Sequence, residues 1–165
     1  MNSTSCALVA GAGIAGLATA KGLHDQGWQV DLVERRPVFD AVPTGLFVPA
    51  NGLRAFAALG AAATLLRCGQ LIQRLRLSSA STDEEGVVDL SLVWPGVGPS
   101  AAIHRPRALA ALVGWCPVPV RFGVGVRSLS QPGERVQAEL TDGSTGEYDL
   151  VVGADGAHST VRAQL

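Results

Sequence analysis

Three glycines near the N-terminus, spaced G-x-G-x-x-G at residues 11–16, restrict what this chain can fold into more than any other feature of its sequence. A short apolar run, Cys6–Ala10, precedes them, and apolar residues at helical spacing follow over Ile14–Asp25. Gly27 is placed to end that helix, and Gln29–Glu34 is typical of a second strand. Strand, glycine turn, helix and strand in succession predict a βαβ unit with a right-handed crossover.

Each glycine of this turn has a physical role. Gly11 permits the tight turn, Gly13 lets a pyrophosphate approach the backbone, and Gly16 lets the helix pack closely on the strand. The helix N-terminus then offers free N–H groups and a positive dipole end to phosphates. The alternative is a tightly packed turn that binds nothing. We predict a dinucleotide-phosphate site made of the whole turn: Gly11, Ala12, Gly13, Ile14, Ala15 and Gly16.

The second predicted strand ends in an acidic residue, Glu34. A carboxylate at this position accepts hydrogen bonds from ribose hydroxyls and repels a 2′-phosphate, which favours FAD or NAD over NADP. Arg35 is expected to pack over the adenine, whereas Arg36 fits a solvated loop better. Glu34 and Arg35 therefore complete a predicted adenine-nucleotide half-site.

Composition excludes several other classes of protein. Apolar residues make up 47% of the chain and charged residues 16%, as in a globular rather than a disordered protein. The formal net charge of -1 provides no field for attracting nucleic acid or an anionic membrane, so neither is expected as a partner. The three cysteines form no C-x-x-C pair, which predicts neither disulfides nor a metal site and fits a cytoplasmic location.

The rest of the chain predicts an α/β fold in which antiparallel hairpins accompany the parallel sheet. Arg36–Asn51 is expected to be a loop, and Leu71–Ser79 and Val87–Trp94 are expected to pair as a hairpin. The other predicted elements are helices at Gly52–Cys68, with a break at Gly60, and at Pro106–Trp115, and strands at Val118–Gly123, Gly125–Leu129, Val136–Thr141 and Tyr148–Gly153.

A second patterned segment runs from Asp149 to Arg162. A buried strand ends at Gly153, and the turn after it presents Asp155-Gly156. Ser159 can cap the helix start that follows. With both motifs in place, the sequence resembles the FAD-binding part of the single-component flavoprotein aromatic hydroxylases, the family typified by p-hydroxybenzoate hydroxylase. The resemblance implies that residues 11–16 bind the ADP moiety and that Asp155 and Gly156 lie close to the pyrophosphate and to the path of the nicotinamide donor.

Three more segments carry the same resemblance. Residues 44–54 resemble the family's G-I-x-L-x-x-N-x-x-R segment beside the flavin, which implies a cofactor contact at Thr44. Residues 103–109 resemble the H-R-x-x-L segment, whose arginine, here Arg105, is expected to reach the ribityl–pyrophosphate region. His104 receives no catalytic role. Residues 71–94 resemble the first piece of the family's substrate-domain sheet.

The resemblance also implies an activity for a complete enzyme of this kind. NAD(P)H would reduce FAD, and an aromatic or polyketide-like small molecule would be hydroxylated or epoxidised. The family's third motif, a Gly-Asp after a later strand, does not occur before Leu165, so residues 1–165 are expected to be an incomplete FAD-binding domain. We expect no catalytic residue in it, little activity of its own, and self-association through apolar surface at Leu150–Gly153 and on Gly52–Cys68.

Two other functions stay open at this stage. An NAD-dependent Rossmann oxidoreductase is one, although the chain has no Ser-x-x-x-Tyr-x-x-x-Lys set: Tyr148 is its only tyrosine and Lys21 its only lysine. A non-catalytic remnant that binds a nucleotide weakly is the other. Bound flavin colour, NAD binding or neither would distinguish the three.

Overall fold

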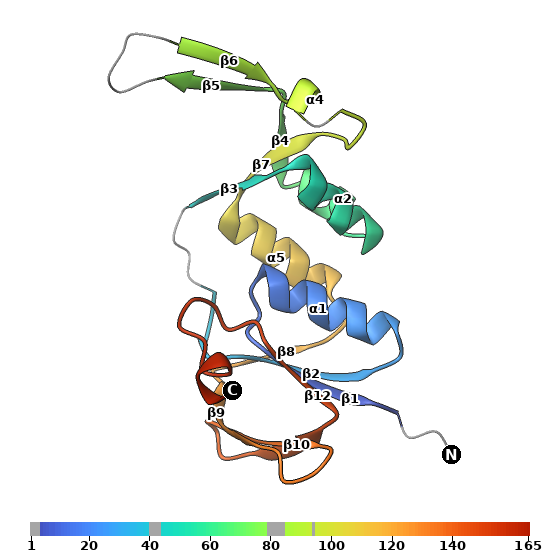
Figure 1. Ribbon diagram of the computed structural model, residues 1–165, viewed down its shortest axis with the longest axis vertical. Coiled ribbons are helices and arrows are strands. Elements are labelled where there is room, and N and C mark those ends of the chain that lie inside the picture. Colours follow the sequence, from blue (N-terminus) through green and yellow to red (C-terminus); the bar gives the residue numbers. More distant parts are fainter. Residues whose placement is uncertain (1–3, 40–43, 79–84, 94) are drawn as a thin grey trace. The chain divides into compact units, whose positions relative to one another are not determined.

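The computed structural model of the chain describes residues 4–39, 44–78, 85–93 and 95–165, which form two compact units (Figure 1). The first unit contains both ends of the chain, Met1–Asp40 and Leu112–Leu165. The second unit contains Ala41–Ala111. Each unit has β-sheets of its own.

A four-stranded parallel sheet with the order β12-β1-β2-β8 forms the centre of the first unit. Helix α1 (Ile14–Asp25) connects β1 to β2, which confirms the predicted βαβ unit with the bounds that the sequence indicated. Strand β12 comes from the other end of the chain and pairs in parallel with β1. The four strands are β1 (Cys6–Ala10), β2 (Gln29–Glu34), β8 (Val120–Phe122) and β12 (Leu150–Gly153).

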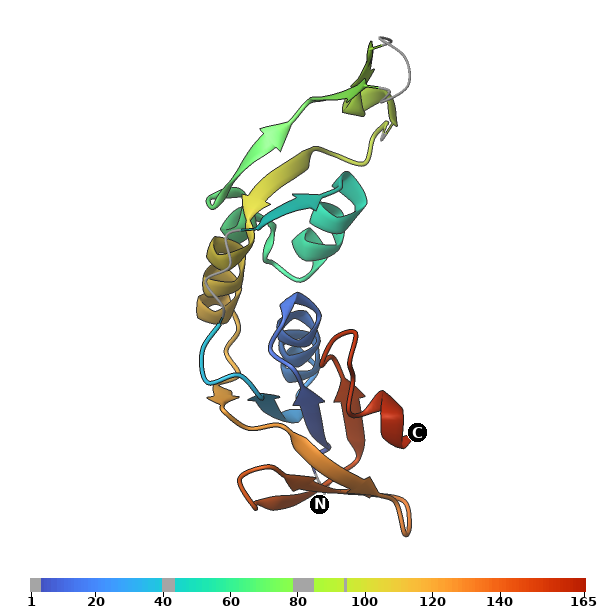
Figure 2. The same cartoon turned by 90° about the vertical axis from the view of Figure 1, so that its left-hand side faces the viewer.

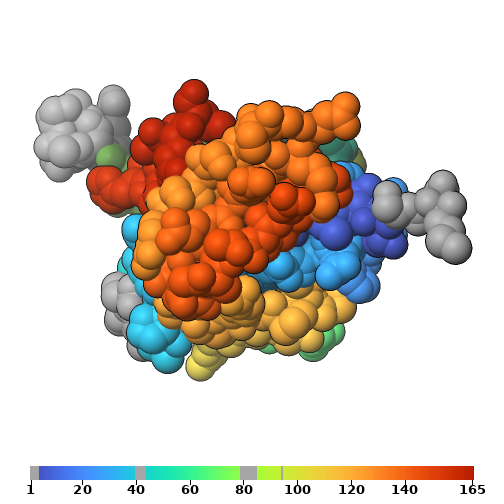
Figure 3. Space-filling model, turned by 90° about the horizontal axis from the view of Figure 1, so that it is seen from below, coloured from blue at the N-terminus to red at the C-terminus, as the bar shows by residue number. Residues whose placement is uncertain are grey.

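A three-stranded antiparallel sheet, β11-β10-β9, belongs to the same unit. Figure 3 shows its outer surface, in orange, in front of the blue strands of the parallel sheet. The Tyr148 hydroxyl donates a hydrogen bond to Asp31 Oδ2 over 2.8 Å and so ties the antiparallel sheet to β2. Burial and the neighbouring Asp31 carboxylate raise the pKa of Tyr148, so the hydroxyl keeps its proton at neutral pH. The strands are β9 (Val126–Ser130), β10 (Val136–Leu140) and β11 (Thr145–Tyr148).

Strand β1 is buried on both faces, which explains its uninterrupted apolar sequence. Leu8 and Ala10 belong to a core that the antiparallel sheet completes with Ala138 and Leu140. Helix α1 contacts both β1 and β2 and buries Leu17. In Figures 1 and 2, α1 lies on one side of the parallel sheet and β9–β11 lie on the other.

The turn after β1 packs directly on the turn after β12. The Ala154 N–H donates a hydrogen bond to the Ala10 carbonyl over 2.7 Å. Gly11 has a φ of +102°, and a Cβ added there would overlap the carbonyl oxygen of Ala154. A Cβ on Gly16 would in turn overlap the carbonyl oxygen of Gly11. Only glycine fits at these two positions, because any side chain would force α1 and the two turns apart.

The second unit contains a three-stranded antiparallel sheet, β3-β7-β4, and a separate hairpin of β5 and β6. The strands are β3 (Gly45–Val48), β4 (Gly69–Ile72), β5 (Arg74–Ser78), β6 (Glu85–Asp89) and β7 (Ser100–His104). The helices are α2 (Ala50–Ala58), α3 (Ala62–Leu66), α4 (Leu90–Val93) and α5 (Arg105–Trp115), of which α5 continues into the first unit.

Several sequence predictions in this unit need correction. The helical segment expected at Gly52–Cys68 has its predicted break at Gly60, where φ is +77°, but its two helices have the bounds Ala50–Ala58 and Ala62–Leu66. The strand expected at Leu71–Ser79 is divided between β4 and β5, which belong to different sheets. The loop expected at Arg36–Asn51 contains β3, and β7 was not anticipated, because such short strands depend on pairing with a segment that is distant in the sequence.

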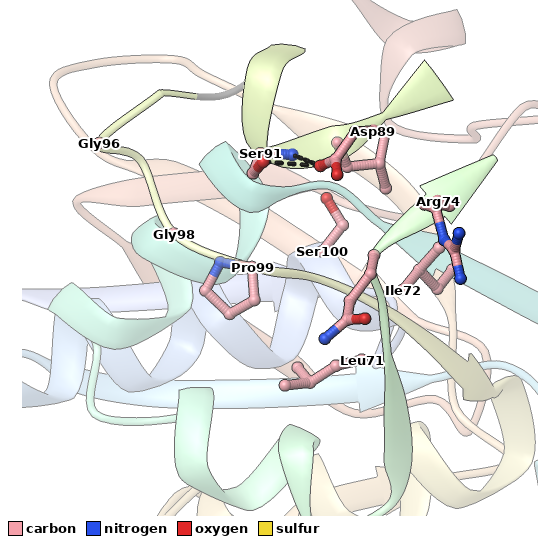
Figure 4. Close-up of a pocket in the computed structure, with 11 residues that line it drawn as sticks. Leu71, Ile72, Arg74, Asp89, Ser91, Gly96, Gly98, Pro99 and Ser100 are labelled. Carbon is pink, nitrogen blue, oxygen red and sulfur yellow. Dashed lines mark hydrogen bonds between the residues drawn. The ribbon is translucent and has the colours of Figure 1, made fainter. Parts of the chain in front are cut away.

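The hairpin is confirmed, with Ser78 paired to Glu85, but its second strand ends earlier than expected. Asp89 Oδ1 accepts hydrogen bonds from the N–H and the hydroxyl of Ser91 (Figure 4), and this side-chain bond to the backbone turns the chain into α4. Ser79 and Trp94, the last residues of the two predicted strands, lie outside the described residues.

The first unit needs two smaller corrections. Thr145–Tyr148 forms a strand of its own, so Tyr148 belongs to β11 rather than to the start of the last parallel strand. Strand β12 is largely half-buried, and the most exposed large apolar side chains are elsewhere. On the hairpin and α4, Leu77, Val87 and Leu92 are 58%, 60% and 79% exposed.

No helix within the described ranges is long and apolar enough to cross a membrane. Among the same residues, no group of three or more histidine, cysteine, aspartate or glutamate side chains could hold a metal ion.

The packing of the two turns predicts the effect of a single methyl group. We expect Gly11→Ala to lower the free energy of unfolding by about 3 kcal/mol or more, because it adds an overlap with Ala154 to a strained positive φ. Gly27→Ala is the matched control, since Gly27 has a φ of +83° but nothing within 4 Å of an added Cβ. Its expected cost is the backbone strain alone, about 1 kcal/mol. Urea denaturation measures both, and equal losses in the two variants would contradict this packing.

Candidate nucleotide-binding site

The turn between β1 and α1 leaves the N-terminus of α1 open. Gly13 is the first residue before the helix and provides no side-chain cap, and the first turn contains no acidic residue. The first helical hydrogen bond runs from Leu17 N–H to the Gly13 carbonyl over 2.9 Å. An uncapped, twelve-residue helix presents unsatisfied N–H groups and a positive dipole end, which suit a phosphate group.

Gly13 differs from the other two glycines of the turn in a way that indicates a ligand. Its φ of -69° is available to any residue, and an added Cβ would meet nothing within 4 Å. Neither backbone conformation nor packing inside the chain therefore requires glycine at this position. Gly11 and Gly16 are needed for packing, whereas Gly13 keeps the approach to the helix N-terminus clear from outside.

Glu34 lies at the end of β2 with its carboxylate against the glycine turn. Oε2 accepts a hydrogen bond from the Ala12 N–H and Oε1 accepts one from the Arg36 N–H, each over 3.0 Å. Each carboxylate oxygen has two lone pairs, so both keep capacity for a ligand hydroxyl. The side chain predicted to contact the ribose is thus fixed beside the residues predicted to contact the phosphates. Arg35, next in the chain, is exposed.

The turn after β12 is built around Asp155. Its Oδ2 accepts hydrogen bonds from the backbone N–H groups of Thr160, over 2.7 Å, and Val161, over 3.3 Å. Burial alone would raise the pKa of this carboxyl, but hydrogen bonding by Ser159, Val161 and Thr160 outweighs it and lowers the pKa. Asp155 is therefore ionised at neutral pH and holds the turn in shape.

The same turn contains an unpartnered carboxylate oxygen and a glycine with a positive φ. Asp155 Oδ1 is buried and has no hydrogen-bond partner among the described residues. Gly156 has a φ of +88°, with nothing within 4 Å of an added Cβ. The Ser159 hydroxyl accepts a hydrogen bond from the Arg162 N–H, over 3.0 Å, but the residue that precedes the 3-10 turn Arg162–Gln164 is Val161, so Ser159 does not cap it as expected.

Sequence reasoning missed the contacts that join this turn to its surroundings. The Ala154 carbonyl faces Gly11, and a Cβ on Gly153 would come within 2.8 Å of Val161 Cβ. The signal was present in the sequence, because Gly153 and Val161 belong to the G-A-D-G and S-x-V-R patterns. Their role as a packing pair could not be deduced from spacing alone.

The predicted site residues fall into two groups. Residues 11–16, Glu34, Arg35, Asp155 and Gly156 belong to the first unit, where the two turns meet at the carboxyl ends of the parallel strands β1 and β12. Thr44 and Arg105 belong to the second unit. There the Arg105 N–H donates a hydrogen bond to the Thr44 carbonyl over 2.8 Å, beside the paired residues Gly45 and His104 of β3 and β7.

Comparison with known proteins identifies the family. Residues 4–165 match the FAD binding domain family. The chain is 33% identical to 3-amino-4-hydroxybenzoate 2-monooxygenase of Streptomyces cremeus over 162 residues, which cover 95% of this chain and 41% of that protein. It is 31% identical to salicylate hydroxylase of Pseudomonas putida over 173 residues, which cover 95% of this chain and 37% of the relative.

Solved structures of related proteins support the same family assignment. Klebsiella pneumoniae HpxO complexed with FAD and uric acid superimposes with a TM-score of 0.85 at 27% identity, covering 96% of this chain and 41% of that one. The tetrameric form of 2-methyl-3-hydroxypyridine-5-carboxylic acid oxygenase gives a TM-score of 0.83 at 28% identity, covering 98% and 42%. The chain thus spans about two fifths of the length of the relatives it matches. The resemblance and the fold class expected from the sequence are confirmed, and the chain belongs to the FAD-binding domain family of the flavin-dependent aromatic hydroxylases and monooxygenases.

Proposed function

We propose that residues 11–16, Glu34, Arg35 and the Asp155-Gly156 turn bind the adenine, ribose and pyrophosphate parts of FAD. The observation that carries this proposal is Gly13, a glycine that the chain's own backbone and packing do not need, at the open N-terminus of α1. Asp155 Oδ1, which has no hydrogen-bond partner among the described residues, is a carboxylate acceptor beside the same pair of turns and suits a hydroxyl donor of the cofactor rather than its phosphates.

The chemistry of each group decides which part of FAD it would hold. The N–H groups at the start of α1 would bind the pyrophosphate, and the fixed Glu34 carboxylate would accept hydrogen bonds from the ribose hydroxyls. Arg35 would cover the adenine. Thr44 and Arg105, which are bonded to each other in the second unit, would contact the ribityl–pyrophosphate region.

The whole protein would be an NAD(P)H-dependent monooxygenase that hydroxylates or epoxidises an aromatic or polyketide-like small molecule. Bound FAD supplies the capacity to accept a hydride from NAD(P)H and to activate molecular oxygen. The residues of this chain bind and orient the cofactor, and none of them is assigned a proton-transfer or nucleophilic role. Relatives named for 3-amino-4-hydroxybenzoate, 3-hydroxybenzoate and salicylate support hydroxylated aromatic acids as the substrate class.

We also propose a cytoplasmic location for this protein and self-association of the chain. Three free cysteines fit the reducing cytoplasm. The exposed apolar side chains of the hairpin and α4 would promote self-association of this chain, in place of the surfaces first expected from the sequence. Nucleic acid is not a proposed partner, given the net charge of -1.

Gly13→Val tests the phosphate position directly. A branched side chain there should block the approach of the pyrophosphate and weaken ADP and FAD binding by at least about a hundredfold. It should cost at most about 1 kcal/mol of stability, because the space around an added Cβ is empty. Isothermal titration calorimetry with ADP and FAD measures the affinities. Gly133→Val, at another open glycine in the turn between β9 and β10, is the control and should bind both ligands normally. Unchanged affinity in Gly13→Val would remove the proposed site.

Glu34 can be tested with a ligand that lacks a ribose hydroxyl. We expect wild-type protein to bind 2′-deoxy-ADP about tenfold more weakly than ADP, because a charge-assisted hydrogen bond is lost. In Glu34→Gln that difference should shrink to less than about threefold, while ADP itself binds more weakly. Glu134→Gln, a change at an exposed glutamate between β9 and β10, should keep the full discrimination. An undiminished preference for ADP in Glu34→Gln would show that this carboxylate does not contact the ribose.

A further inference from the structure

The loop between β8 and β9 lies along the residues that end and follow β2. The Gly123 N–H donates a hydrogen bond to the Arg36 carbonyl, and the Val124 N–H donates one to the Glu34 carbonyl, each over 3.0 Å. Arg35 is the residue between these two acceptors. The loop therefore fixes the backbone on both sides of Arg35, at the carboxyl end of β2.

The same loop is anchored on its other side to the antiparallel sheet. The Gly125 N–H donates a hydrogen bond to Thr141 Oγ1, and the Thr141 N–H donates one to the Gly125 carbonyl, each over 2.9 Å. Thr141 directly follows β10. Since both backbone polar groups of Gly125 are bonded to Thr141, this part of the loop is held in place beside Arg35.

Gly125 lies so close to Arg35 that a side chain would not fit without a shift. A Cβ added at residue 125 would come within 3.2 Å of Arg35 Cβ, closer than ordinary van der Waals contact. The backbone itself does not need glycine here, because Gly125 is not among the glycines with a positive φ. Because the loop is anchored on both sides, the stem of Arg35 is the part that would have to move. Glycine at this position thus serves the placement of Arg35.

The side chain of Arg35 is exposed, so the contact with Gly125 leaves its guanidinium accessible to a ligand. A guanidinium is planar and stacks on the face of a flat ring. We propose that Gly125 is a positioning residue for the base of the nucleotide, because it sets the course of the Arg35 stem and so places the guanidinium over a purine ring. The inference rests on the proposed function, which assigns Arg35 to the adenine, and it adds the residue on which that contact depends.

ADP and UDP separate the base contact from the others, because both carry the same ribose and pyrophosphate. Isothermal titration calorimetry on the 165-residue chain should show ADP binding about tenfold more tightly than UDP, since the larger purine offers more surface for stacking. Gly125→Ala should reduce this preference to about threefold or less, mainly by weakening the binding of ADP. Gly133→Ala is the matched control and should keep the full preference, because Gly133 has no positive φ and nothing within 4 Å of an added Cβ.

Arg35→Ala shows whether Gly125 acts through the guanidinium. This variant keeps the Cβ that an alanine at residue 125 would meet, so Gly125→Ala should lower the free energy of unfolding equally in both backgrounds, as urea denaturation measures. The preference for ADP, already reduced in Arg35→Ala, should not fall further in the double variant.

Three results would overturn the inference and leave the cofactor proposal standing: wild-type protein that binds ADP and UDP equally well, an undiminished preference in Gly125→Ala, or a further fall in the double variant. If the wild type does not bind ADP, the cofactor proposal itself fails.

Discussion

The contact between Gly11 and Ala154 is the constraint on which the first unit depends. It joins the turn after the first strand to the turn after the last, and it is possible only because residue 11 has no side chain and a φ of +102°. The hydrogen bond from Ala154 N–H to Ala10 sets the same two turns in register. Gly16 then brings α1 against Gly11, so that helix, first turn and last turn meet at one edge of the sheet.

This arrangement brings together two motifs that are far apart in the sequence. The glycine turn alone would position a helix N-terminus, but the second motif supplies the surface on which that turn rests. Asp155 stabilises the turn after β12, because its carboxylate accepts hydrogen bonds from the backbone N–H groups of Thr160 and Val161. Glu34 stabilises the glycine turn after β1, because its carboxylate accepts a hydrogen bond from the Ala12 N–H. Gly13, which we propose faces the ligand, thereby lies in a turn with fixed neighbours, while the space beside it is open.

The sequence predicted those parts of the fold in which local pattern and tertiary structure agree. β1, α1 and β2 have the predicted bounds because their apolar periodicity, the glycine turn and Gly27 all indicate the same boundaries. The second unit was predicted less well, because its strands are short and partly exposed and depend on their pairing partners. β3 and β7 illustrate this: each is short, and each is a strand because it pairs with a segment distant in the sequence, β3 with β7 and β7 also with β4.

The same distinction applies to the candidate site. The glycine turn and Glu34, which we propose bind phosphate and ribose, could be identified from their spacing, and both lie in the first unit, where the Ala12 N–H bonds to Glu34. Contacts that depend on packing could not be read in this way. The inward direction of the Asp155 carboxylate, the fit of Val161 against Gly153 and the fit of Arg35 against Gly125 all arise from tertiary neighbours that no local pattern records.

Amide hydrogen exchange with and without saturating ADP tests the central claim most directly, because it reports on both turns in one experiment. If the turns form one nucleotide site, ADP should slow exchange at residues 12–16 and at residues 154–157 together, and leave β9 and β10 unchanged. Protection at the glycine turn alone, or at neither turn, would contradict the account that the two motifs act as a single binding site.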